Sequence, residues 1–192
     1  MLHLNRQSLK ENRAEWEAQG FQLYSFDDEA VTSSTAQSPK WLHVGGGNIF
    51  RAFIAPLQQQ LLETGKEHTG ISVMTTHNMA VIDDVYRPYD NLSVAVTMYA
   101  DGHFDKKVIG NVVESLGCAR NRLQDWQKLI DIFTSPTLQL VSFTITEKGY
   151  KLTDTVGKDT YCVICNEKTS TSSKMVKAQK LNIPVYSQEE FY

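Results

Sequence analysis

A short apolar run that ends in three glycines constrains the fold more than any other feature of this sequence. Residues 41–44 read Trp-Leu-His-Val, and Gly45, Gly46 and Gly47 follow without a break. Beyond the glycines, apolar side chains recur at helical spacing, and the set is Phe50, Phe53, Ile54, Leu57 and Leu61. The pattern predicts a strand that turns tightly into a helix, and Pro56 is expected to kink that helix or break it locally.

Strand and helix patterns alternate along most of the chain. β-prone runs lie at 70–75, 92–99, 107–113 and 138–146, with an amphipathic helix over 125–133. A strand at 161–165, a helix at 173–181 and a strand at 184–187 are expected to follow. Residues 1–40 are polar, with one weak helix at 9–18 and a Ser/Thr-rich stretch at 32–38, and are interpreted as an arm lying on the domain. This order predicts an α/β fold with a Rossmann-like, doubly wound, mostly parallel sheet.

The glycine turn has the chemistry of a pyrophosphate site. The first glycine permits the tight turn, the second lets the backbone approach the anion, and the helix N-terminus offers free N–H groups. Arg51 could bind a phosphate or a carboxylate of a ligand. The alternative is a surface arginine that pairs with a nearby acidic side chain. Phe50 replaces the third glycine of G-x-G-x-x-G, so a plain strand-to-helix turn is the alternative. The predicted cofactor-binding residues are Gly45, Gly46, Gly47, Asn48, Ile49 and Arg51.

The end of the second predicted strand lacks the acid that usually binds the ribose of NAD. The residues there are Thr75-Thr76-His77-Asn78, and Asp83 and Asp84 come later. This departure weakens strict NAD selectivity, so NAD and NADP both remain candidate cofactors. His77 is a candidate contact for the cofactor or a substrate.

Composition limits the remaining classes of function. The formal net charge of −3 gives no general indication of nucleic-acid binding. No apolar run approaches the roughly 20 residues of a membrane helix, and the N-terminus is too polar for a signal peptide, so a cytoplasmic protein is expected. Cys162 and Cys165 would face opposite sides of a strand, which favours buried small residues over a metal or redox pair. No metal site is predicted.

Five segments resemble the mannitol dehydrogenase family, which includes fructuronate and tagaturonate reductases. They are LNRQSLK, WLHVGGGNIFRAFIAPLQ, VIDDVYRPYDNLSVAVTM, KKVIGNVVESL and VSFTITEKGYKL. The most specific marks are Gly45-x-Gly47-x-x-x-Arg51-Ala52 and the pentad at 146–150. The resemblance runs from about residue 4 to 157 and implies a Rossmann-type domain, NAD(H) or NADP(H), and hydride transfer between a polyol and a keto-sugar. The family's catalytic Lys, Asn and His come from a later helical domain without a counterpart here, so no catalytic residue is assigned, and Lys148 is not the general base.

The last 35 residues resemble the second half of a BRCT domain. The marks are TYCVIC, SSKMVKAQKL, IPVYS and the closing EEFY. The family binds proteins, often phosphorylated ones, and sometimes DNA ends, and its phosphate-contacting lysine matches Lys174 beside Ser173. The family's first strand, Gly-Gly turn and last helix are missing. The alternative for Lys174, Lys177 and Lys180 is a solvated helix face.

These patterns predict two regions, residues 1–157 and 158–192. The second is expected to pack on the sheet of the first, beside 138–146, because about 35 residues rarely bury a core alone. One hypothesis is a hybrid NAD(P)-binding domain related to mannitol dehydrogenases and lacking their catalytic domain. The alternative is a non-catalytic structural or BRCT-type interaction module with a phosphopeptide or a DNA-repair-type partner.

Overall fold

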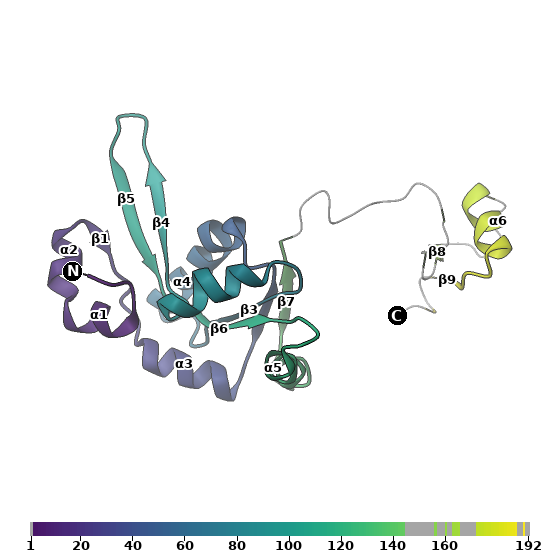
Figure 1. Cartoon of the computed structure of the whole chain (residues 1–192), viewed down its shortest axis with the longest axis horizontal. Coiled ribbons are helices and arrows are strands. Elements are labelled where there is room, and N and C mark those ends of the chain that lie inside the picture. The colour runs from purple at the N-terminus through teal and green to yellow at the C-terminus, as the bar shows by residue number, and fades with distance from the viewer. Residues whose placement is uncertain are drawn as a thin grey trace. The chain divides into compact units, whose positions relative to one another are not determined.

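The chain divides into two units, Met1–Ile145 and Thr146–Tyr192, which are described separately. The structure is a computed structural model that describes residues 2–144, 156, 160, 163–165, 172–187 and 190 (Figure 1). The predicted boundary between residues 157 and 158 falls outside the described residues and stays a prediction. The pentad at 146–150 and Cys162 lie outside them too.

A four-stranded parallel sheet forms the centre of the first unit. Its strands, in the order β6-β3-β2-β7, are β6 (Val112–Gly117), β3 (Ile71–Thr75), β2 (Trp41–Val44) and β7 (Leu140–Phe143). Every pairing within this sheet is parallel. In chain order, β3 pairs with one side of β2 and β6 then pairs with β3, whereas β7 pairs with the other side of β2. This is the 3-2-1-4 portion of a doubly wound sheet, so the predicted Rossmann-like α/β fold is confirmed.

Helices cover both faces of this sheet. Between β2 and β3 run η1 (Phe50–Ile54) and α4 (Ala55–Glu63), and between β6 and β7 runs α5 (Leu123–Phe133). The first core contains Phe50 and Ala55 packed with Ile71 and Val73 of β3. A second core joins α5 to the sheet through Leu42, Met74, Leu116, Leu129 and Ile132. The two cores give the sheet the buried faces that a parallel sheet requires.

The helix is locally irregular next to Pro56, where the sequence predicts a kink or a break. Proline has no N–H to donate to the carbonyl four residues earlier. The helix is a π-helix over Phe50–Ile54, where the Ala55 N–H donates to the Phe50 carbonyl, and it becomes an α-helix from Ala55. The local break therefore lies next to Pro56.

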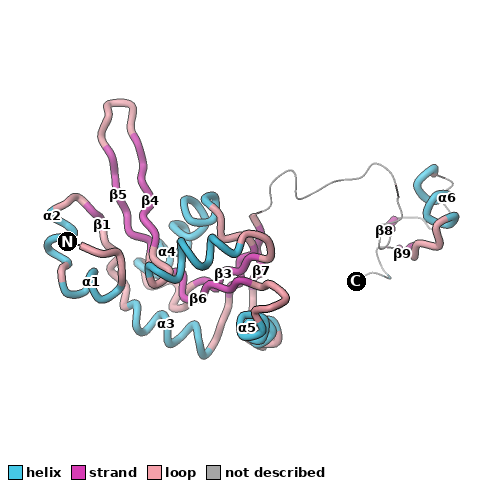
Figure 2. The backbone as a smooth tube through the Cα atoms, viewed as in Figure 1, coloured by secondary structure: helices cyan, strands magenta, loops and turns pink. Residues whose placement is uncertain are grey.

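The N-terminal residues build a small layer beside a β-hairpin. The layer contains α1 (Arg6–Glu11), α2 (Arg13–Ala18), β1 (Phe21–Gln22) and α3 (Asp28–Gln37). The hairpin of β4 (Ser93–Met98) and β5 (Phe104–Ile109) projects from the unit, and β1 adds to it alongside β5 (Figure 2). Leu9, Trp16, Tyr24, Leu92 and Val108 form the shared core. The arm does lie on the domain, and most of its Ser/Thr-rich stretch at 32–38 is helical, within α3. The single strand predicted at 107–113 is the end of β5 and the start of β6.

Two short helical segments lie between β3 and the hairpin. They are η2 (Val81–Tyr86), a π-helix, and η3 (Arg87–Tyr89), a 3₁₀ turn. The side chains of Ile82 and Tyr86 are buried in the first core. This segment therefore ties the region after β3 to the sheet.

The second unit contains a strand–helix–strand motif. Its elements are β8 (Val163–Cys165), α6 (Ser173–Lys180) and β9 (Val185–Ser187), and β8 pairs with β9 in a parallel two-stranded sheet. Lys174, Lys177 and Lys180 are exposed on α6, as a solvated helix face would be. That this motif extends the sheet of the first unit stays a prediction, which the melting of residues 1–157 alone would test. Among the described residues, no helix is both long enough and apolar enough to cross a membrane.

Candidate functional site at the glycine turn

The glycine turn lies at the carboxyl end of β2, where the sheet order reverses between β2 and β7. The Gly45 N–H donates to the Met74 carbonyl of β3 at 2.9 Å. The Thr144 N–H, just after β7, donates to the Val44 carbonyl at 3.0 Å. Ligands of open α/β sheets bind in the crevice at this point. The six predicted cofactor-binding residues are thus brought to one edge of the sheet.

The three glycines have different roles. Gly45 has a φ of +112°, and a Cβ there would lie 2.7 Å from the Thr144 carbonyl oxygen, so only glycine fits. A Cβ on Gly46 would lie 3.1 Å from the Tyr86 ring, whose hydroxyl donates to the Gly46 carbonyl at 2.9 Å. A Cβ on Gly47 would meet nothing within 4 Å. The first two glycines therefore shape the turn, and the third leaves open space.

The helix after Gly47 begins with unpaired N–H groups. Its first backbone bond runs from the Arg51 N–H to the Gly47 carbonyl at 3.1 Å, so the N–H groups of Asn48, Ile49 and Phe50 precede the helical ladder. The Arg51 guanidinium donates to Asn48 Oδ1 and lies 5.9 Å from the centroid of the Tyr86 ring. Among the described residues it pairs with no acid. Open space, free N–H groups and an arginine together fit the diphosphate of a dinucleotide.

A buried hydrogen-bond network connects β2 and β7 beneath the turn. Thr144 Oγ1 donates to the Gly45 carbonyl at 2.8 Å and lies 3.1 Å from His43 Nε2. On the other side of the ring, Ser142 Oγ lies 2.7 Å from His43 Nδ1 and accepts from Trp41 Nε1 at 2.7 Å. Because Thr144 uses its proton on Gly45, His43 Nε2 must donate, and His43 Nδ1 accepts from Ser142. When the His43 imidazole is neutral, every donor in this network therefore has an acceptor.

Burial keeps His43 in this neutral form. Its side chain is fully buried and stacks on Phe50, with ring centroids 4.3 Å apart. Desolvation lowers the pKa of His43 to about 4, against a weaker opposing hydrogen bond at Gly45. This stack and network position Gly45 and the first helical turn. Sequence reasoning missed this role, although a histidine between Leu42 and Val44 of an apolar strand was the available signal.

The carboxyl end of β3 carries neutral polar side chains. Thr76 and His77 are exposed, and Thr76 Oγ1 lies 2.9 Å from His77 Nδ1. Asp83, on η2 near this edge, is paired with arginines. A hydrogen bond from Arg122 lowers the pKa of Asp83, and Arg87 Nη1 lies 3.5 Å from Asp83 Oδ1.

Asp125 of α5 is also paired with an arginine. Both of its carboxylate oxygens accept from Arg87 Nη2 at 2.8 Å, and Oδ2 also accepts from the Gly117 N–H at 2.9 Å. The charges of Arg87 and Arg122 thus neutralise those of Asp125 and Asp83 at this edge. Within the described residues, no group of three His, Cys, Asp or Glu side chains could hold a metal ion.

Comparison with known proteins identifies relatives of the first unit. The chain is 49% identical over 156 residues to a D-mannonate oxidoreductase of Thermotoga maritima, an alignment covering 81% of this chain and 29% of that protein. Over this alignment the chain is similar to an oxidoreductase of the mannitol dehydrogenase type, as the resemblance in the sequence predicts. A mannitol 2-dehydrogenase of Cereibacter sphaeroides is 31% identical over 130 residues, or 66% of this chain and 24% of that protein. The chain spans less than a third of these relatives.

Two solved dehydrogenase structures share the fold. A mannitol 2-dehydrogenase of Pseudomonas fluorescens, in a ternary complex with NAD and D-mannitol, matches with a TM-score of 0.59 at 23% identity. The match covers 91% of this chain and 30% of that one. A substrate-free D-sorbitol dehydrogenase matches with a TM-score of 0.58 at 24% identity, over 71% of this chain and 26% of that one.

The C-terminal resemblance is also confirmed. The family model for the BRCA1 C Terminus (BRCT) domain matches residues 129–192. The match begins earlier than the predicted 158 and includes β7. In the structure, β7 pairs with β2 of the first unit. The BRCT match therefore begins inside the first unit, within α5.

Proposed function

We propose that the first unit binds NAD(H) or NADP(H) at the glycine turn. The observation that carries the proposal is the open position of Gly47 in front of three N–H groups at the helix start. Gly47, Asn48 and Ile49 would face the diphosphate, and Arg51 would add a positive charge. The named ligand of the Pseudomonas relative is NAD, which supports the same class of ligand here. When bound, the cofactor supplies or accepts hydride.

A direct binding titration tests this proposal. Reduced nicotinamide fluoresces, so NADH or NADPH can be titrated with the full chain, and a thermal-shift series can follow in parallel. We expect saturable binding and a midpoint that rises with ligand concentration. Absence of both effects for both dinucleotides would contradict a dinucleotide site.

We also expect no turnover by the 192-residue chain alone. Hydride transfer to a sugar needs a positioned general base and a substrate pocket. The chain spans 29% of the D-mannonate oxidoreductase, and the resemblance places the catalytic Lys, Asn and His in a later domain. Absorbance at the nicotinamide band should stay at background with NAD and mannitol or mannonate, and with NADH and fructose or fructuronate. A rate that is lost in Lys148→Ala would contradict this view.

A protein-interaction role is a second candidate for the C-terminal segment. The BRCT match and the exposed Lys174 near the start of α6 favour it. Binding of a phosphoserine peptide pool by the full chain, measured by fluorescence polarisation and weakened in Lys174→Ala but not in Lys180→Ala, would support it. Equal binding of the unphosphorylated pool would contradict it.

A further inference from the structure

We infer that the cofactor site selects NADP(H) over NAD(H), with Arg120 as the contact for the 2′-phosphate. This inference rests on the proposed dinucleotide site and concerns its far end, at β3 and β6. In sites that prefer NAD, a carboxylate after the second strand binds the ribose hydroxyl, and the same negative charge repels a 2′-phosphate. The first side chains after β3 in this chain, Thr76 and His77, carry no negative charge.

The first two side chains beyond β3 can hydrogen-bond a phosphate. Thr76 offers a hydroxyl and His77 an imidazole, and the two lie 2.9 Å apart. Both are exposed at the edge where the adenosine ribose of a dinucleotide lies in doubly wound folds. Neither carries a negative charge, so nothing in this pair opposes a phosphate dianion.

Two of the acids near this edge, Asp83 and Asp125, are already paired with arginines. Asp83 on η2 accepts hydrogen bonds from both Nη atoms of Arg122, and Asp125 accepts from Arg87. The positive charges of these arginines already balance the two carboxylates, so neither acid presents an unpaired negative charge to a ribose. Asp84 is exposed one position beyond Asp83, on the same helical segment.

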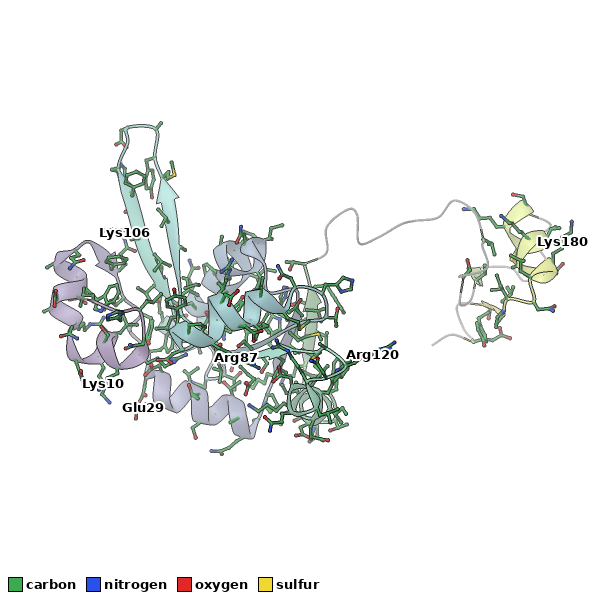
Figure 3. All side chains as sticks on the ribbon, viewed as in Figure 1. Lys10, Glu29, Arg87, Lys106, Arg120 and Lys180 are labelled. Atoms are coloured by element: carbon green, nitrogen blue, oxygen red, sulfur yellow. The ribbon has the colours of Figure 1, made fainter. Side chains whose placement is uncertain are left out.

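A free arginine lies on the loop next to this edge. β6 is the neighbour of β3, Gly117 pairs with Thr75, and the Cys118 N–H donates to the Thr75 carbonyl at 2.8 Å. Arg120 follows two residues later. Its side chain is exposed, extends out from the first unit (Figure 3), and has no ion pair among the described residues. Its neighbour Arg122 is committed to Asp83, so Arg120 is the guanidinium available for a phosphate.

Titration of NADPH and NADH with the full chain tests this inference. We expect NADPH to bind at least about tenfold more tightly, since the 2′-phosphate adds charge-assisted hydrogen bonds. Adenosine 2′,5′-bisphosphate should compete better than 5′-AMP by a similar factor, which assigns the preference to the phosphate. Thr76→Asp, which restores a carboxylate at the end of β3, should reverse the order of the two dinucleotides.

Arg120→Ala should weaken NADPH binding to near the level of NADH and leave NADH binding unchanged. Lys66→Ala is the matched control, because it removes an exposed cation between α4 and β3, at the opposite edge of the sheet. Equal or tighter binding of NADH to the parent chain would overturn the inference while the dinucleotide site stands. Binding of neither dinucleotide would overturn the site as well. A NADPH preference that Arg120→Ala leaves intact would remove Arg120 from the 2′-phosphate site.

Discussion

Gly47→Val should abolish dinucleotide binding without unfolding the protein. A Cβ at residue 47 would meet nothing within 4 Å, so a larger side chain begins in open space. It would occupy the space in front of the helix N-terminus, where the diphosphate is expected. We expect an affinity loss of at least about 100-fold for NADH and NADPH, which is about 2.7 kcal/mol. Fluorescence titration measures the loss, and a thermal melt of the free protein should show an unchanged midpoint.

Gly45→Ala provides the contrasting variant. Its Cβ would lie 2.7 Å from the Thr144 carbonyl, and the φ of +112° disfavours any L side chain. This variant should melt at a lower temperature before any ligand is added. If Gly47→Val destabilises the free protein as much as Gly45→Ala does, the space at residue 47 is not a ligand site. If Gly47→Val binds NADH as the parent does, the diphosphate lies elsewhere.

Elements that end in glycine or proline could be predicted well from the sequence. The strand before Gly45 was placed at 41–44, as observed, and the helix before Pro136 was placed within two residues of its start. Glycine and proline end a strand or helix through the local backbone conformation, so their effect can be predicted without knowing the tertiary contacts. The switch in helix type beside Pro56 follows from the same physics.

The helix α3 could not be predicted, because its stability comes from tertiary contacts. Ser and Thr are weak helix formers, and residues 32–38 contain five of them. In the structure, Asp27 caps the helix at the Ala30 N–H. Thr35 is buried, where its hydroxyl donates to the Val31 carbonyl and accepts from the Gly70 N–H. Burial of one helix face outweighs the low propensity.

The apolar spacing after the glycine turn predicted a helix correctly but not the face that this unit buries. Phe50 is buried, whereas Phe53, Leu57 and Leu61 lie exposed in a line with Ile49 along η1 and α4. Spacing of four residues places these four side chains on one side of the helix. Periodicity indicates an apolar face without indicating what packs on it.

The candidate site could be predicted as a turn but not as a network. Gly45 to Gly47 are contiguous, and their conformational freedom is visible in the sequence. The partners of His43 come from Ser142 and Thr144, which are about 100 residues away along the chain. Their contribution depends on β7 pairing in register beside β2, where His43 stands opposite Ser142. Sequence patterns specify which strands form more readily than which side chains meet across them.

The neutral state of His43 should make the protein sensitive to mild acid. The unfolded chain protonates this histidine near pH 6.5, whereas burial lowers the pKa in the folded protein to about 4. Between these values the unfolded state binds more protons, so the free energy of unfolding falls as pH falls. The stabilisation is complete above pH 6.5, and the full loss of about 3 kcal/mol is reached below pH 4. Urea melts from pH 7.5 to 4.5 measure it in a range where most carboxylates remain ionised.

His43→Gln should flatten this dependence, because the amide does not titrate. His68→Gln is the control, since His68 is exposed on the loop before β3 and its removal should leave the slope unchanged. If His43→Gln folds poorly, the imidazole proton signals of the parent chain supply the same information through their titration midpoints. The His43 ring should titrate near pH 4. A parent chain whose stability is flat from pH 7.5 to 4.5, or whose His43 ring titrates near pH 6.5, would show that the imidazole beneath the glycine turn is open to water.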